Sequence, residues 1–189
     1  VMNNSWSSGA VVGYSSKAAE WDLLVRDPNP NSATLEKLVI VFAAGNKGPQ
    51  PKTITEPHEG KNTIIVGNSM NKPIVPVQRS EDIRWVVEDS SRGPADDGRI
   101  LPTIVAPGRF IVSTRSTADA DPNTPGVQRP LDAFVEPSTT VHADYTFYSG
   151  TSMAAPHVSG LCALLIEWWR KRTGGKNPSP ALLKALLIN

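Results

Sequence analysis

Apolar residues gather in short runs and periodic stretches toward the two ends of the chain. Residues 38–43 (LVIVFA) form a continuous run that is rich in β-branched side chains and is followed closely by Gly45. Such a run is typical of a strand buried on both faces of a parallel sheet. Residues 63–66 show the same pattern, whereas residues 14–26 carry apolar side chains at helical spacing before Pro28. The pattern predicts two buried strands and one helix.

Helical periodicity is strongest after residue 150, where apolar side chains recur at steps of three and four: Val158, Leu161, Leu164, Leu165 and Trp168. This spacing predicts one long buried helix over residues 151–172, whose basic end suits the negative pole of the helix dipole. Gly174 and Gly175 end it, and Ser179 before Pro180 predicts the N-cap and first turn of a last helix through residue 187. The alternation of strands and helices favours the α/β class.

The composition is that of a globular chain and gives no reason to expect a nucleic-acid or membrane partner. The 189 residues suit one domain or a large piece of one, and the net charge is only +1. The longest apolar runs, 38–45 and 161–166, are much shorter than the roughly 20 residues of a membrane-spanning helix. The single cysteine, Cys162, lies in an apolar stretch, so we expect a buried thiol and no disulfide framework.

Residues 150–157 (GTSMAAPH) hold the strongest candidate for chemistry. Ser152 follows small residues at the predicted start of the long helix. Free backbone N–H groups and the positive end of the dipole favour developing negative charge at such a position. A serine there can attack a carbonyl carbon and have the oxyanion stabilised nearby. The alternative is that Ser152 only caps the helix, as many serines do.

The octapeptide as a whole resembles the serine signature of the subtilisin family of serine peptidases. A second match, Ala43-Ala44-Gly45-Asn46, follows the buried strand, where the family places the asparagine whose amide donates to the oxyanion. Further similar stretches occur in the family's order and span nearly the whole chain: residues 4–7, 57–67, 90–94 with 97–99, and 106–108. The stretch at 57–67 is most similar to the kexin-like and alkaline-protease branches.

The resemblance implies a three-layer α/β sandwich in which helices flank a mostly parallel sheet. Residues 1–189 would supply the C-terminal part of such a peptidase domain, with the sheet incomplete on its N-terminal side. A sheet that lacks strands should expose an apolar edge, which invites a partner or aggregation.

The resemblance also implies a serine endopeptidase with Ser152 as nucleophile and Asn46 as oxyanion donor, acting through an acyl-enzyme without an organic cofactor. The substrate would be a polypeptide bound as an extra β-strand, in a cleft formed by Ser5, Trp6, Ser7, Ala43, Ala44 and Gly45. The family usually has glycine where Ser7 stands, so we expect a narrower pocket or an altered preference. Family members of this kind are secreted, so we expect an extracellular location.

A serine nucleophile needs a general base, and the chain has three histidines: His58, His142 and His157. His157 lies five residues beyond Ser152 on the predicted helix, rotated by about 140° and raised by about 7.5 Å. Its ring therefore points away from the hydroxyl, and we expect it to serve helix packing. His58 and His142 lack the sequence context of the family's catalytic histidine.

The family's aspartate and histidine precede the serine in the chain, so we expect both upstream of Val1. On this interpretation the chain is a fragment of a complete domain and is inactive alone. The alternative is a catalytically dead, subtilase-like module that binds peptides.

The sequence assigns no metal site. Asp119, Asp121 and Asn123 have the alternating oxygen spacing that opens a calcium loop, but the sixth and twelfth positions lack the required glycine and glutamate. Thr103 stands where some family members have an aspartate at a cation site, so that site is not carried over. Structural calcium stays unassigned.

Two other functions fit less well. An α/β-hydrolase requires its acid and histidine after the serine, and only Glu167 and the unsuitable His157 follow Ser152. The aromatic and basic residues of 168–172 could suggest nucleic-acid binding, but they fit an apolar stripe and a solvated helix end. The oligomeric state stays open.

Overall fold

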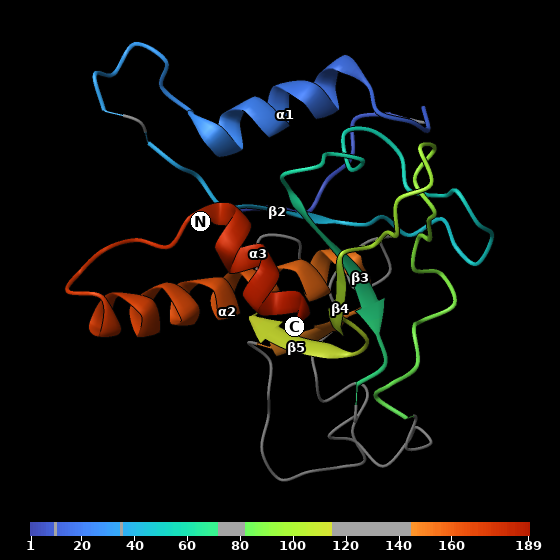
Figure 1. Cartoon of the computed structure of the whole chain (residues 1–189). Coiled ribbons are helices and arrows are strands. Elements are labelled where there is room, and N and C mark those ends of the chain that lie inside the picture. The colour runs from blue at the N-terminus through green and yellow to red at the C-terminus, as the bar shows by residue number, and fades with distance from the viewer. Residues whose placement is uncertain (10, 35, 72–81, 115–144) are drawn as a thin grey trace, which may run out of the picture.

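The computed structural model describes residues 1–9, 11–34, 36–71, 82–114 and 145–189 (Figure 1). Four strands form a parallel sheet in the order β1-β2-β3-β4, and two more form an antiparallel pair. The strands are β1 (Met2–Asn4), β2 (Ile40–Ala43), β3 (Ile64–Ser69), β4 (Ile104–Pro107), β5 (Ile111–Thr114) and β6 (Tyr145–Tyr148). The helices are α1 (Ser16–Arg26), α2 (Thr151–Arg172) and α3 (Pro180–Ile188).

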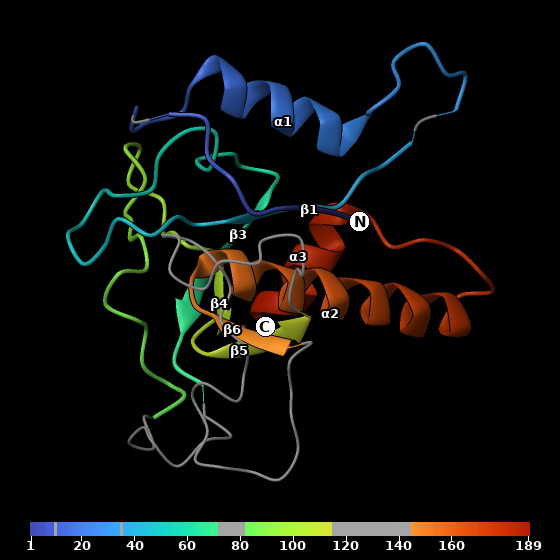
Figure 2. The same ribbon diagram turned by 180° about the vertical axis from the view of Figure 1, so that it is seen from behind.

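The parallel sheet separates two hydrophobic clusters, because successive side chains of a strand point to opposite faces. Val41 and Ala43 of β2 belong to the cluster that α2 and α3 cover. Ile40 and Phe42 belong to the other cluster, which Val25 of α1 helps to close. The ribbon views show α1 on one side of the sheet and α2 with α3 on the other (Figure 1 and Figure 2). The predicted α/β architecture, with helices on both faces of a mostly parallel sheet, is confirmed.

Element boundaries lie within three residues of those that the sequence pattern predicts. α1 begins at Ser16, two residues later than predicted, because Ser15 is its N-cap and accepts a hydrogen bond from the N–H of Ala18 at 3.3 Å. Ser179 caps α3 in the same way, through the N–H of Leu182 at 3.1 Å. α2 spans its predicted range, β2 begins two residues later, and β3 ends three residues later than predicted.

The prediction that α2 buries its whole apolar stripe is wrong for Leu161, Leu164 and Trp168, which are exposed. The helix packs on the sheet through a narrower stripe: Ala154, Ala155, Val158 and Cys162. The other side of α2 has no covering element in the described parts of the chain. Cys162 is buried as expected, and this burial raises the pKa of its thiol to about 11.

β1 is an open edge of the parallel sheet. Within the described residues it pairs only with β2, with Met2 opposite Ile40 and Asn4 opposite Phe42. Met2 on this strand is exposed, as are Val1 just before it and Trp6 shortly after it. Figure 2 shows β1 at the rim of the sheet, alongside the chain that leads into β2. The structure therefore has the apolar edge that an incomplete sheet is expected to expose.

Candidate active site

Ser152 lies in the first turn of α2, and the chain enters this turn through a glycine. Gly150 has φ 145°, which L side chains rarely adopt, and its N–H donates to the carbonyl oxygen of Gly108 at 2.8 Å. A Cβ on Gly108 would lie only 2.6 Å from the carbonyl oxygen of Gly150. The two glycines thus let the turn before the nucleophile pack directly against the end of β4.

Ser152 is paired with the segment that follows β1. The hydroxyl of Ser5 donates to the carbonyl oxygen of Ser152 at 3.0 Å, and the Ser152 hydroxyl reaches the carbonyl oxygen of Ser5 at 3.4 Å. The second contact is long for a hydroxyl donor, so it restrains the nucleophile only weakly. The structure brings the predicted nucleophile and the first predicted cleft residue together across 147 positions of sequence.

Asn46 lies three residues beyond the end of β2, and Thr151 fixes the orientation of its side chain. Oδ1 of Asn46 accepts hydrogen bonds from the backbone N–H of Thr151 at 3.0 Å and from its hydroxyl at 2.9 Å. Since Oδ1 takes both donors, Nδ2 is the free end of the amide. It hydrogen-bonds to no described residue and lies beside Gly150, where a Cβ would be 3.2 Å away.

The Ser152 N–H is a second unused donor. The N–H groups of Met153 and Ala154 both donate to the carbonyl oxygen of Gly150, and that of Thr151 donates to Asn46. The Ser152 N–H has no acceptor among the described residues. The N–H of Ser152 and Nδ2 of Asn46, two donors without acceptors in the part of the chain that the structure describes, therefore lie around one helix N-terminus, where the dipole favours negative charge.

Ser91 supports the turn that carries Asn46. Its hydroxyl accepts the N–H of Lys47 at 3.0 Å, and its own N–H donates to the carbonyl oxygen of Gly45 at 2.8 Å. Gly45 has φ 101°, and a Cβ on it would lie 2.9 Å from the Ser91 hydroxyl. The 90–94 stretch thus contributes to the site by supporting the turn on which Asn46 lies. Sequence reasoning noticed that stretch but assigned no role to Ser91 or to Thr151.

The remaining predicted cleft residues lie in two neighbouring segments. Because β1 and β2 are parallel and in register, Trp6 and Ser7 continue beside Ala44 and Gly45 beyond the carboxyl ends of the strands. Trp6 and Ser7 are exposed. Ala43 and Ala44 bury their methyl groups in the two opposite core clusters, so they offer mainly backbone to a cleft. Their role in binding a substrate stays a prediction.

Trp6 is held in place by an aromatic cluster on the α1 side of the sheet. Its ring lies 5.8 Å from that of Trp21 and 5.5 Å from that of Phe42, and its indole N–H donates to Oδ1 of Asn4 at 3.2 Å. His58, which is 1% exposed, packs against Phe42 and places Nε2 at 2.8 Å from the carbonyl oxygen of Trp6. Because a carbonyl oxygen only accepts, Nε2 carries the proton.

Nε2 of His58 is thus a fixed donor to the carbonyl oxygen of Trp6, and burial lowers the pKa of the imidazole. His157 is exposed, and its Nδ1 donates to the carbonyl oxygen of Met153 at 2.9 Å. The prediction that His157 serves helix packing is wrong, since its position on α2 points it to solvent. His142 lies outside the described residues. No histidine of the described parts of the chain is bonded to the hydroxyl of Ser152.

Asp119, Asp121 and Asn123, whose spacing resembles the start of a calcium loop but to which the sequence assigns no metal, also lie outside the described residues. In the parts that the structure describes, no group of three or more His, Cys, Asp or Glu side chains could hold a metal ion. Thr103 has a different use, because its hydroxyl accepts the N–H of Ile65 at 3.1 Å and so ties the start of β4 to β3. None of the described helices is both long enough and apolar enough to cross a membrane.

Comparison with known proteins places this geometry in a family. The profile of Peptidase S8, the subtilase family, matches residues 1–189. Serine protease AprX of Bacillus subtilis is 35% identical over 154 residues, which cover 80% of this chain and 30% of that protein. Pyrolysin of Pyrococcus furiosus is 31% identical over 181 residues, covering 84% of this chain and 11% of that protein. The chain thus spans less than a third of the length of these relatives.

Among solved structures, fervidolysin from Fervidobacterium pennivorans, described as a keratinolytic enzyme related to subtilisin, has 26% sequence identity and a TM-score of 0.51. The match covers 79% of this chain and 18% of that structure. The sequence match over all 189 residues and the shared fold agree. The chain therefore belongs to the subtilase family.

Proposed function

We propose that this chain carries the nucleophile and the oxyanion-binding groups of a serine endopeptidase. The observation that carries the proposal is the arrangement around the start of α2, where the turn that carries Ser152 also holds two donors without acceptors among the described residues. These donors are the N–H of Ser152 itself and Nδ2 of Asn46. Donors that are fixed before the reaction stabilise the negative charge that develops in the transition state of acyl transfer.

In the proposed reaction, Oγ of Ser152 attacks the carbonyl carbon of the scissile peptide bond as its proton passes to a histidine. The carbonyl oxygen becomes an oxyanion and receives hydrogen bonds from the Ser152 N–H and from Asn46. Collapse of the tetrahedral intermediate forms an acyl-enzyme and releases the amine, which takes the proton from the histidine. Water then hydrolyses the ester in the same way.

The base of this reaction is proposed to lie upstream of Val1, together with the aspartate that orients it. His58 is bonded to Trp6 and His157 to Met153, so neither ring is available to Ser152. The 189 residues alone are then expected to be inactive. The substrate is proposed to be an extended polypeptide beside Ser5–Ser7, and the location to be outside the cell, as in the secreted peptidases that the chain resembles.

Fluorophosphonate labelling tests this proposal, because only an activated serine reacts quickly with such a reagent. The natural polypeptide that contains these residues, the 189-residue chain alone and the Ser152→Ala variant would be labelled in parallel. Ser159→Ala is the matched control, since Ser159 lies on the same helix and bonds to Asn3 instead. Mass spectrometry should find the label on Ser152 in the natural polypeptide and in the Ser159 variant only. A folded natural polypeptide without label would leave a peptide-binding module that lacks catalysis.

A further inference from the structure

A cavity of about 670 Å³ lies at the end of the sheet opposite to Ser152. Its lining residues come from the end of α1, from the segments that lead into β2 and β3, and from the start of α3. In a parallel sheet all strands begin on the same side, and the cavity lies at these amino ends. The nucleophile and Asn46 lie beyond the carboxyl ends of the strands. The volume is in the range of pockets that bind small molecules.

Four of the nine lining residues are cationic: Arg26, Lys37, Lys61 and Lys184. No lining residue is acidic, and none of the four cations forms an ion pair with any described carboxylate. Like charges that surround a concave space raise the local electrostatic potential and attract an anion. Lys61 packs its ammonium over the ring of Tyr14 at 4.6 Å, a contact that brings no negative charge to it.

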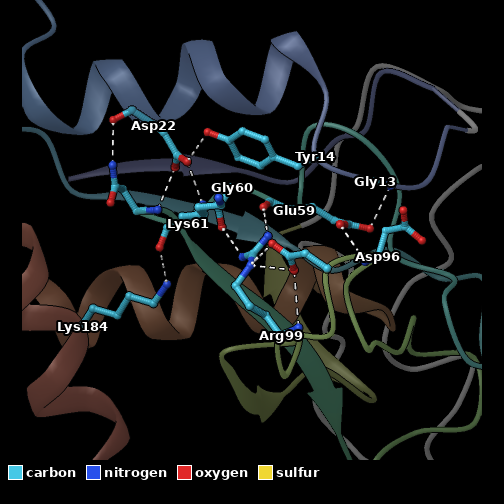
Figure 3. Close-up of polar contacts among 11 residues, drawn as sticks. Gly13, Tyr14, Asp22, Glu59, Gly60, Lys61, Asp96, Arg99 and Lys184 are labelled. Atoms are coloured by element: carbon cyan, nitrogen blue, oxygen red, sulfur yellow. Dashed lines mark hydrogen bonds and ion pairs between the residues drawn. The ribbon is translucent and has the colours of Figure 1, made fainter.

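The buried carboxylate of Asp22 lies behind one wall of the cavity and is hydrogen-bonded to two of its lining residues. It accepts the N–H of Lys61 at 2.8 Å and that of Asn62 at 2.7 Å, and the hydroxyl of Tyr14 at 2.9 Å (Figure 3). Charge-assisted bonds of this kind hold the 61–62 loop in a defined position. Asp22 therefore fixes the position of two lining residues without facing the cavity itself.

Lys184 joins α3 to the same loop. Its ammonium group donates to the carbonyl oxygen of Lys61 at 3.1 Å and to that of Thr63 at 2.8 Å, and Figure 3 shows the side chain reaching from α3 toward Lys61. One of its three protons is left for a further acceptor. Burial lowers the pKa of Lys184, and a bound anion would oppose this effect.

The amino end of α3 adds a neutral donor to the cations. Ser179 and Ala181 line the cavity, and the N–H of Ala181 has no acceptor among the described residues. α3 has nine residues, enough for its dipole to favour negative charge at this end. Val25 and Pro180 provide apolar walls.

We propose that this cavity is an anion-binding site, separate from the peptidase cleft, that takes a small oxyanion with two or more negative charges. Polycarboxylates and phosphate-type anions share the required chemistry. The ligand would connect α1, the 61–62 loop and α3, so its binding should stabilise the folded state against unfolding.

Thermal unfolding of the natural polypeptide tests the site, with citrate and pyrophosphate as separate probes and sodium chloride at matched ionic strength as reference. The Arg26→Gln/Lys37→Gln variant removes two exposed lining cations that have no partner in the described chain. Lys47→Gln/Lys176→Gln, two exposed cations outside the cavity, is the control with the same change in net charge.

We expect at least one probe to raise Tm saturably in the natural and control proteins. The apparent Kd of that probe should be at least about ten-fold weaker in the Arg26/Lys37 variant, because two Coulomb attractions are lost. Calorimetric titration of the natural polypeptide with the same probes should give one site per chain. Equal responses of the two double variants, or no saturable binding of either probe, would overturn the proposal. Fluorophosphonate labelling of Ser152 tests the proposed peptidase function separately, so failure of the anion site and failure of the peptidase proposal can be told apart.

Discussion

Thr151 donates two hydrogen bonds to a single atom of Asn46, from its backbone N–H at 3.0 Å and from its hydroxyl at 2.9 Å. The same hydroxyl accepts the N–H of Gly45 at 3.1 Å. The residue next to the proposed nucleophile therefore orients the proposed oxyanion donor. It also ties the turn after β2 to the start of α2, so the two halves of the oxyanion site are built as one unit.

Replacing Thr151 with valine should lower kcat by about five-fold, because one hydrogen bond of about 1 kcal/mol no longer orients the amide of Asn46. KM should change little, since Thr151 is buried and Asn46 acts on the transition state. Steady-state kinetics of the natural polypeptide on a peptide substrate measure both quantities. Thr173→Val, at the other end of α2, is the matched control and should leave kcat unchanged. An equal loss in both variants would point to a general effect on the helix.

Removing the donor itself should have a larger effect. Asn46→Ala is expected to lower kcat by about 10²–10³-fold, a magnitude that was measured for the loss of one oxyanion donor in subtilisin itself. Asn46 is exposed, so the variant should fold. The second-order rate of fluorophosphonate labelling of Ser152 should fall as well. A rate within two-fold of the natural protein would exclude Asn46 from the oxyanion site.

The sequence predicted what a local pattern can encode. Continuous apolar runs located β2 and β3, and the serine and asparagine motifs located Ser152 and Asn46. The supporting contacts could not be predicted, because they join residues that are far apart in the chain. Thr151 and Asn46 are separated by 105 positions, and His58 and Trp6 by 52. No short pattern marks a threonine or a buried histidine as the partner of a given carbonyl or amide.

The prediction of which α2 side chains are buried failed for a related reason. Helical periodicity shows which apolar side chains share a stripe, but it does not show how wide a surface the neighbouring elements cover. The sheet covers Val158 and Cys162, whereas Leu164 on the same helix is 64% exposed. The short β5–β6 pair was also missed, because its strands are only partly buried and carry no long continuous apolar run.

Asp22 should be needed for stability although it lies far from Ser152. Asp22→Asn places an amide group where two backbone N–H groups and a hydroxyl now donate to a carboxylate. Since hydrogen bonds to charged groups are worth about 1.5–3 kcal/mol each, we expect the free energy of unfolding to fall by at least about 2 kcal/mol. Denaturant unfolding measures this change. Glu20→Gln, an exposed carboxylate on the same helix, should change stability by less than about 0.5 kcal/mol.

His58 should make the folded state sensitive to mild acid. Burial lowers its pKa in the folded protein, so the unfolded chain binds the proton more readily. The free energy of unfolding is then unaffected by this group above about pH 6.5, and it falls as the pH drops from there toward the lowered pKa.

Two substitutions separate the charge of His58 from its hydrogen bond to Trp6. His58→Gln keeps an N–H donor for the carbonyl oxygen of Trp6 but cannot titrate, so it should retain most of the stability at pH 7.5 and lose the acid sensitivity. His58→Phe also removes the donor, and the unpaired carbonyl should cost about 1–3 kcal/mol at either pH. Denaturant unfolding at pH 7.5 and pH 5.5 distinguishes the two, with the exposed His157→Gln as control. Acid sensitivity that survives in both His58 variants would have to arise from another group.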